Sequence, residues 1–279
     1  MYNIDYNRFI EMAKNNELKV TDIDHHKLIS DVNTVNKKYP DITKKANAYV
    51  LSDLINLFDD MCEEYQTLID VETYLKRYME VVHTGLVDNP FTTGLNEDEL
   101  KVYEVVLKIR GYSAYRSKLA EISFALLCEH YYDNEYEVVF NNNKMDIILG
   151  VDITLLHKHS DMAHYIHVTR DSKFSKDQMF KKAKSYNTVV DNRYDNEGPN
   201  KTIYRQFRRN FDNHITALYN EYSDNNDVVN GIFLFKKEYI DDLIEANVNK
   251  ANRNYYDELS YVELADVQIR TTYDKVIIK

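Results

Sequence analysis

Apolar residues recur at three- and four-residue steps through most of the first 110 residues of the chain. That spacing places them on one face of an α-helix, so residues 5–110 are expected to be helical, with a polar face left to solvent. The clearest stripe lies within residues 66–83. Its apolar positions are Leu68, Val71, Tyr74, Tyr78 and Val81.

A helix start and a helix end bracket the next segment. Asn96 precedes three consecutive acids, and a capping residue followed by acids is typical of a helix N-terminus. We expect that helix to end at Gly111, because glycine commonly follows the last turn of a helix. Ser113 is then expected to cap a further helix over about 113–132.

The pattern changes to alternation after residue 132, which favours β-strands. Strands are expected at Tyr136–Phe140, 145–156, Tyr165–Arg170 and Gly231–Phe235, and again at 261–269 and 275–278. Helices are expected at 177–186, 202–222 and 236–246. These elements predict an α/β (α+β) fold, in which a central mixed sheet is flanked by helices and preceded by a helical N-terminal region. We therefore expect a helical region over residues 1–111 and an α/β domain over 112–279.

Composition narrows the class of protein. The first 18 residues are polar and no apolar run is long enough to cross a membrane, so we expect neither a signal peptide nor a membrane partner. The two cysteines, Cys62 and Cys128, lack metal-binding spacing and cannot form a disulfide framework. The cytoplasm is therefore the expected compartment.

The net charge of −11 argues against a protein that simply coats nucleic acid, but the charge is uneven. Residues 144–209 hold 13 Lys and Arg against 8 Asp and Glu, so the acidic excess lies elsewhere. Two interpretations stay open: a basic segment that faces phosphates, or a mixed solvated surface. Under the first, the expected nucleic-acid contacts are cations that follow the third strand and begin the helix 202–222. They are Lys173, Lys176, Lys181, Lys182, Arg205, Arg208 and Arg209.

The segment 144–156 carries the strongest candidate chemistry. Its odd positions from 147 are apolar, whereas its even positions include Asp146, Gly150 and Asp152. Because successive side chains of a strand point to opposite faces, both aspartates belong to the polar face. A straight strand would hold them roughly 20 Å apart, so they share a metal ion only if the chain turns, as Gly150 permits. The alternative is an edge strand with a solvated face.

Two other elements offer side chains to such a site. Glu121 lies on a small, apolar face of the helix 113–132, so it either points into a site or marks the border of the apolar stripe. In the strand Tyr165–Arg170, His167 and Thr169 share one face. Carboxylates on adjacent strands are suited to Mg²⁺, which binds one or two carboxylates and keeps waters for phosphate chemistry.

A helix with Glu121, a strand, a strand with Asp146 and then a third strand resemble the PD-(D/E)XK restriction-endonuclease-like superfamily over about residues 113–235. The resemblance implies a nuclease that hydrolyses phosphodiester bonds, with DNA favoured over RNA. It also implies a Mg²⁺ or Mn²⁺ cofactor, for which Asp146 and Asp152 would be ligands, supported by Glu121.

The last motif of this superfamily, an acid-x-Lys, departs from the pattern here. Asp152-Ile153-Thr154 has the acid but threonine for lysine, and His167-Val168-Thr169 lacks both residues. His167 and Thr169 remain catalytic candidates beside the carboxylates. The departure keeps a second function class open, namely a mobile-element or host-interaction protein that binds a protein or nucleic acid without cutting. A homodimer is compatible with either class.

The histidines form further patterns. His157-x-His159 has a spacing suited to a metal, although a polar hairpin loop explains it as well. His167-x-Thr169 and His214-x-Thr216 resemble the paired motifs of the two-histidine phosphoesterases, which implies histidines that act as general acid and base. That arrangement requires both motifs on strands, whereas the pattern around His214 predicts a helix.

Overall fold

The computed structural model describes residues 3–24, 54, 56–86, 92, 94–140, 151–160, 162–172 and 214–255, with positions 27, 30, 34 and 37–41. The chain forms two compact units. The first comprises Met1–Ser123 with Val228–Leu234, and the second comprises Phe124–Asp227 with Phe235–Lys279. None of the described helices is long and apolar enough to cross a membrane.

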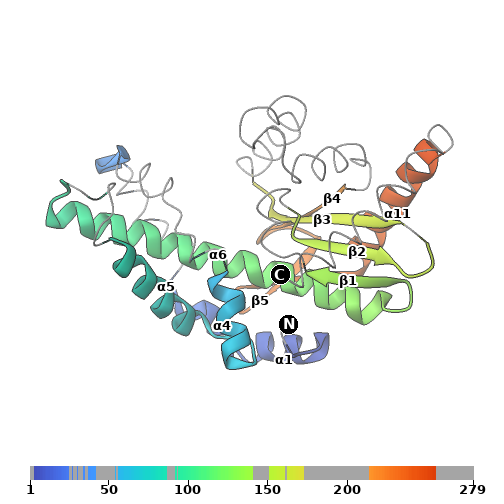
Figure 1. The fold of residues 1–279 in the computed structure, drawn as a ribbon, viewed down its shortest axis with the longest axis horizontal. Coiled ribbons are helices and arrows are strands. Elements are labelled where there is room, and N and C mark those ends of the chain that lie inside the picture. The colour runs from blue at the N-terminus through green and yellow to red at the C-terminus, as the bar shows by residue number, and fades with distance from the viewer. Residues whose placement is uncertain are drawn as a thin grey trace, which may run out of the picture. The chain divides into compact units, whose positions relative to one another are not determined.

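The first unit is mainly helical, as expected. Its described helices are α1 (Tyr6–Lys14), the short 3₁₀ helix η1 (Val20–Asp22), α4 (Leu57–Tyr65), α5 (Val71–Leu86) and the first part of α6 (Glu97–Tyr132) (Figure 1). The predicted stripe is confirmed at Leu68, Val71, Tyr74 and Tyr78, which are buried. Val82 closes the stripe in place of Val81, because Val82 is fully buried and Val81 is only half-buried.

Helix α6 runs unbroken through 36 residues, so the predicted end at Gly111 and the second start at Ser113 are wrong. The predicted start is confirmed: Asn96 Oδ1 accepts a hydrogen bond from the Glu99 amide at 3.0 Å, and Glu99 Oε2 accepts one from the Asn96 amide at 2.9 Å. Gly111 allows close packing of two helices and does not end α6. A Cβ atom at this position would lie 2.9 Å from the ring of Tyr78, so glycine lets α5 and α6 approach closely.

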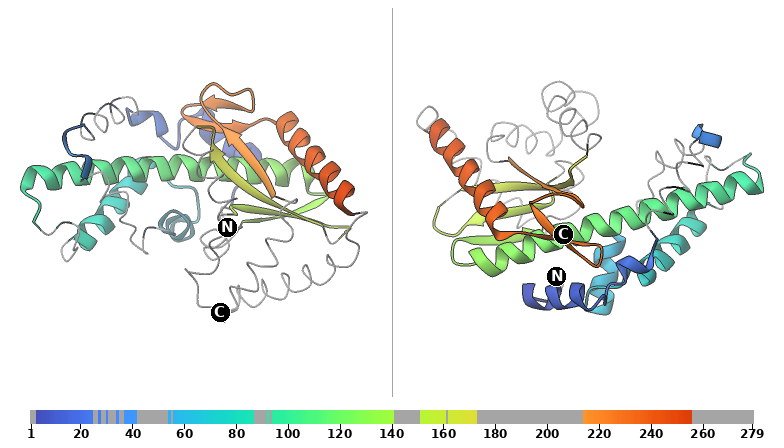
Figure 2. Two further views of the ribbon diagram at one scale, coloured as in Figure 1. Left: turned by 90° about the horizontal axis from the view of Figure 1, so that it is seen from above. Right: turned by 180° about the vertical axis from the view of Figure 1, so that it is seen from behind.

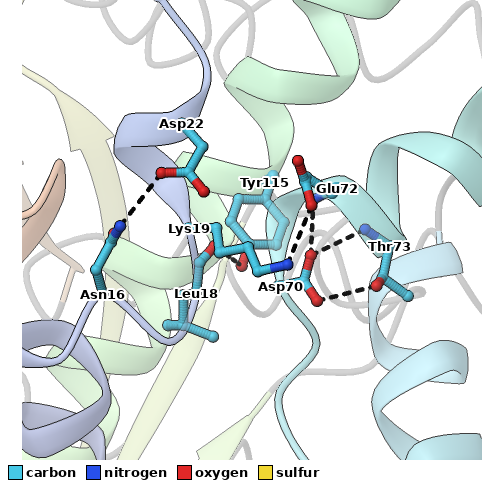
Figure 3. A network of polar contacts seen from close by, with 8 residues as sticks. All are labelled: Asn16, Leu18, Lys19, Asp22, Asp70, Glu72, Thr73 and Tyr115. Atoms are coloured by element: carbon cyan, nitrogen blue, oxygen red, sulfur yellow. Dashed lines mark hydrogen bonds and ion pairs between the residues drawn. The ribbon is translucent and has the colours of Figure 1, made fainter.

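A polar network in the first unit fixes the loop after α1 against the start of α5 (Figure 3). Asp70 caps α5 by accepting hydrogen bonds from the amides of Glu72 and Thr73, both at 3.0 Å. Lys19 Nζ forms an ion pair with Glu72 at 3.1 Å. The hydroxyl of the buried Tyr115, on α6, donates to the Ile69 carbonyl at 2.8 Å, so three segments meet at this point.

The second unit contains the mixed sheet predicted from the sequence. Its strands are β1 (Tyr136–Phe140), β2 (Ile153–His157), β3 (Ala163–Arg170) and β4 (His214–Tyr219), side by side in that order (Figure 2). β1 pairs with β2 and β2 with β3 in antiparallel fashion, whereas β3 and β4 are parallel. β3 is therefore an interior strand, and its first six residues are all buried.

Strand β4 contradicts the helix expected over 202–222, at least for His214–Tyr219. Burial alternates along it, with Ile215, Ala217 and Tyr219 buried and the residues between them half-buried. That is the period of a strand, and pairing along the full length of β4 with β3 stabilises it. The isolated segment also fits a helical pattern, so the tertiary pairing decides its structure.

A hairpin of β5 (Asn226–Val229) and β6 (Ile232–Phe235) follows, and β5 was not predicted. Its two-residue turn is Asn230-Gly231, with φ of 46° and 78°, the left-handed pair that such hairpins favour. Asn230 Nδ2 donates to the Ala13 carbonyl at the end of α1, at 2.9 Å. The hairpin tip thus packs within the first unit, to which Val228–Leu234 belong.

Helix α11 (Lys237–Tyr255) packs against β4, where the Leu218 amide donates to Tyr239 Oη at 2.9 Å. It extends the predicted helix 236–246. The other expected elements, at 177–186, 261–269 and 275–278, lie outside the described residues.

Candidate functional site

Asp152 stands immediately before β2, next to the interior strand β3. Val151, Ile153 and Leu155 are fully buried, so the predicted apolar face is confirmed over residues 151–155. The Asp152 amide donates to the Ile166 carbonyl at 2.9 Å, and Asp152 Oδ2 accepts a hydrogen bond from the Val168 amide at 2.6 Å. The carboxylate therefore continues the pairing of β2 and β3 beyond the last backbone pair.

The alternative of an edge strand is wrong, because β2 lies between β1 and β3. On its polar face, Thr154 retains only 3% of its exposure, whereas Asp152 is half-buried. A polar group in such a place requires a hydrogen-bond partner or a function.

The third strand brings together side chains that are far apart in the sequence. His167 and Thr169 lie on β3 as predicted, and the parallel register places Thr216 of β4 opposite His167. His214 lies opposite Tyr165, two residues earlier on the same face. His167 Nε2 lies 2.8 Å from His214 Nδ1, and the two ring planes are 17° apart. Both His-x-Thr motifs therefore occupy neighbouring strands of one sheet.

The surroundings of this pair affect the pKa of His214. Burial, followed by the nearby His167, lowers the pKa of His214 to about 3. His214 is therefore neutral at physiological pH. Sequence reasoning missed this contact because it assigned His214 to a helix, although the repeated His-x-Thr spacing signalled the relation.

Glu121 has a local role in the first unit. Lys118 Nζ lies 3.2 Å from Glu121 Oε2 and 3.2 Å from Asp59 Oδ2, so it bridges α6 and α4. Burial opposes the charge on Lys118, but the two carboxylates raise its pKa above the ordinary value. Glu121 and the second-unit residue Asp152 thus each have identified partners within their own units.

Other expected site residues lie outside the described residues. For Asp146, the expected convergence with Asp152 stays a prediction. The same holds for the basic candidates Lys173, Lys176, Lys181, Lys182, Arg205, Arg208 and Arg209.

The His157-x-His159 motif forms the turn between β2 and β3. His157 Nδ1 accepts a hydrogen bond from the His159 amide at 3.1 Å and lies 3.0 Å from Ser160 Oγ. His159 Nε2 lies 3.3 Å from the Asn134 carbonyl. These contacts fit the interpretation of a polar hairpin loop. Across the part of the chain that the structure describes, no three or more His, Cys, Asp or Glu residues are arranged to hold a metal ion.

Both cysteines are buried and free. Burial raises the pKa of Cys62 to about 12, and it also raises the pKa of Cys128. Neither thiol is therefore a nucleophile at neutral pH.

No protein-family model, curated protein or solved structure matches this chain. Two contacts define the site: Asp152, immediately before β2, lies against the Val168 amide of β3, and His167 of β3 lies against His214 of β4.

Proposed function

We propose that the second unit of this chain hydrolyses phosphodiester bonds in nucleic acid, with DNA favoured over RNA. One observation carries the proposal: Asp152 Oδ2 accepts a hydrogen bond from the amide of Val168. Val168 is the central residue of His167-Val168-Thr169, the third-strand segment compared with the acid-x-Lys motif of restriction-endonuclease-like nucleases. Asp152, which immediately precedes β2, thus lies against the segment of β3 that is expected to supply the remaining catalytic groups.

The order of elements gives further support. Helix α6, then β1, β2 and β3 follow one another along the chain, which is the order on which the resemblance rests. β3 is an interior strand, so groups on it are held rigidly by neighbours on both sides. Rigid placement favours catalysis because reacting groups lose little freedom when substrate binds.

Metal dependence is part of this proposal, with Mg²⁺ or Mn²⁺ as the ion. When bound, such an ion polarises the phosphate and provides an activated water. The described residues do not fit it by themselves, because no three potential ligands among them converge. Asp146, which lies outside the described residues, would have to join Asp152.

The test uses the full chain with DNA and RNA substrates in Mg²⁺, in Mn²⁺ and in EDTA. We expect cleavage with a metal and none in EDTA. Asp152→Asn should lower the rate by roughly 100-fold or more, the scale of losing one group that acts in the transition state. The variant should fold, because the amide oxygen still accepts the Val168 hydrogen bond.

The matched control is Asp224→Asn, which removes one carboxylate from an exposed position in the turn before β5. It should leave the rate unchanged. Cleavage that persists in EDTA, or in both the Asp146→Asn and Asp152→Asn variants, contradicts the proposed site.

A second candidate is binding of nucleic acid without cleavage. It is favoured by Thr169, which stands where the superfamily has its lysine, and by the structural hydrogen bond of the Asp152 carboxylate. Salt-sensitive binding of DNA or RNA, with no cleavage under any metal condition, would support this candidate.

A further inference from the structure

The turn that follows β4 carries Tyr222, the most exposed large hydrophobic side chain of the described residues. Tyr222 retains 93% of its exposure, compared with 52% for Tyr65 and 47% for Tyr131. Single exposed apolar side chains are ordinary on a protein surface, so exposure alone assigns no role. Tyr222 differs from an ordinary surface residue because the backbone around it is held in place.

Asparagine side chains fix the backbone of this turn. Asn220 Oδ1 accepts a hydrogen bond from the Tyr222 amide at 2.6 Å, and the Asn220 amide donates to Asn226 Oδ1 at 3.2 Å. Asn226 Nδ2 in turn donates to the Asn220 carbonyl at 3.1 Å, and Asn225 Nδ2 donates to the Leu218 carbonyl of β4 at 3.0 Å. The ring of Tyr222 is thus presented on an ordered turn, which lowers the entropy lost when a partner binds.

Ion pairs reduce the negative charge around this turn. Its acids and those at the start of β5 are Glu221, Asp224 and Asp227. Glu221 Oε2 lies 3.0 Å from Arg170 Nη2, and Asp227 Oδ1 lies 3.3 Å from Lys236 Nζ. Two of the three carboxylates therefore have a cation beside them, so the turn does not present an unbroken acidic surface to an anionic partner.

The turn lies at the end of the sheet that carries the candidate site. β3 and β4 are parallel, so both have their carboxyl ends there, and β2 begins there because it is antiparallel to β3. Asp152, before β2, and Thr169, near the end of β3, belong to the same end. Arg170, the last residue of β3, holds the turn through Glu221. In open α/β sheets, ligands bind beyond the carboxyl ends of the strands.

An exposed aromatic ring on an ordered turn is suited to a flat π-face. Each nucleobase has such a face, and unpaired bases stack on aromatic side chains whatever their identity. A base within a duplex already stacks on its neighbours, so its face is not open to a side chain. The position of Tyr222 beside the candidate phosphodiester site therefore favours an unpaired base as its partner.

We infer that Tyr222 stacks on an unpaired base of the bound nucleic acid, and that the substrate of the proposed site is single-stranded near the cleaved bond. The inference rests on the proposed function and narrows its substrate class. Stacking does not depend on the sugar, so the ring accepts a base of DNA or of RNA.

The affinity of the full chain for a single-stranded oligonucleotide measures the stack. Titrations are made in EDTA, in which no cleavage is expected. Tyr222→Ala should raise Kd by about 5- to 150-fold, the range for one lost base–aromatic stack. Tyr222→Phe keeps the ring and should stay within about threefold of the wild type. Tyr65→Ala, at the exposed end of α4, is the matched control and should leave Kd unchanged.

The chain contains no tryptophan, which allows a spectroscopic test that does not depend on activity. Tyr222→Trp introduces a single indole, and a base that stacks on it should quench its fluorescence. Single-stranded DNA or RNA should quench it, whereas a relaxed, closed circular duplex, which offers no unpaired base, should not. Tyr65→Trp is the control and should respond to neither. If circular dichroism shows that Tyr222→Ala does not fold, this quenching alone decides the inference.

The outcomes separate the inference from the proposed function. Cleavage that Asp152→Asn abolishes, with no quenching of Tyr222→Trp, overturns the inference and leaves the function standing. Equal quenching by the circular duplex overturns the single-stranded substrate class. Quenching that grows with protein concentration alone shows self-association through the turn and also overturns the inference. Quenching by single strands without cleavage under any metal condition supports the stack and overturns the proposed hydrolysis.

Discussion

The imidazole of His164 lies fully buried on β3, where its Nδ1 is 2.7 Å from Oδ1 of Asn247 on α11. An amide oxygen only accepts hydrogen bonds, so Nδ1 carries the proton and donates. Among the described residues, nothing forms a hydrogen bond with Nε2. A second proton on this ring would therefore be buried without an acceptor, and burial accordingly lowers the pKa of His164.

The burial of His164 and His214 predicts that the protein loses stability in weak acid. The folded protein resists protonation of His164 and His214, whereas the unfolded chain takes these protons as pH falls below about 6.5. Unfolding then binds protons, so the free energy of unfolding decreases as the pH is lowered. For His214 the loss continues down to about pH 3, where the folded form also protonates. His214 should contribute about 1.4 kcal/mol between pH 7.5 and 5.5, because its pKa in the folded protein lies well below this interval, and His164 adds a loss of the same sign.

Denaturant melts of the wild type and of His164→Gln at both pH values measure this effect. Glutamine does not titrate, and its amide can still donate to Asn247. The variant should therefore lose less stability than the wild type over this pH interval, because it lacks the contribution of His164. Equal losses in the two proteins would contradict the assignment.

At the scale of elements, α6 depends on a residue that normally weakens helices. Glycine in a helix interior costs roughly 0.5–1 kcal/mol relative to alanine. At Gly111 an added Cβ would meet the Tyr78 ring at 2.9 to 3.1 Å, and Tyr78 is buried against Tyr74. The ring cannot withdraw easily, so steric overlap should outweigh the gain in helix propensity.

Gly111→Ala should consequently destabilise the protein by about 1–3 kcal/mol, the usual range for overpacking. Ser113→Ala, at an exposed position of the same helix, is the matched control and should be neutral or slightly stabilising. Combining Gly111→Ala with Tyr78→Ala removes the overlapping ring, so the two losses should be less than additive in denaturant melts. Full additivity would show that the contact is not the cause.

The same elements show what the sequence could and could not predict. β1 was located from its alternation, and β3 and β6 nearly so, because their apolar patterns match what the fold buries. β4 was assigned to a helix, since its stability comes from pairing with β3, which no local pattern reveals. β5 was not predicted, although Asn230-Gly231 is a strong hairpin signal between it and β6.

The candidate site was predictable to a similar degree. Alternation correctly placed His167 and Thr169 on β3, and it identified the buried face beside Asp152. The contact of His167 with His214 depends on the register of two strands separated by more than 40 residues. Such a contact follows from the sheet order, which the linear pattern does not contain.

At the scale of the whole molecule, neither compact unit is a continuous stretch of chain. Helix α6 begins in the first unit and ends in the second. The β5–β6 hairpin likewise has its tip in the first unit and its outer residues in the second. A fragment cut at the expected boundary of 111/112 would divide α6 where it packs on α5, so experiments on function require the full chain.

Charge also varies along the molecule, and its basic segment gives the last prediction. Lys181, Lys182, Arg208 and Arg209 belong to the basic stretch 144–209 of an otherwise acidic chain. If they contact phosphates, replacing all four with alanine should weaken binding of DNA or RNA. Each lost contact should reduce the slope of log affinity against log salt by about 1, because fewer counterions are released.

The matched control replaces four exposed cations of the helical unit, Lys27, Lys76, Lys101 and Lys108, which changes the net charge equally. A uniform electrostatic effect would weaken binding in both variants alike, whereas a specific interface loses affinity only in the first. The competing interpretation is that the basic residues pair with acidic ones inside the protein. In that case the first variant would unfold at lower denaturant concentration, and the wild type would show no salt-sensitive binding to nucleic acid at all.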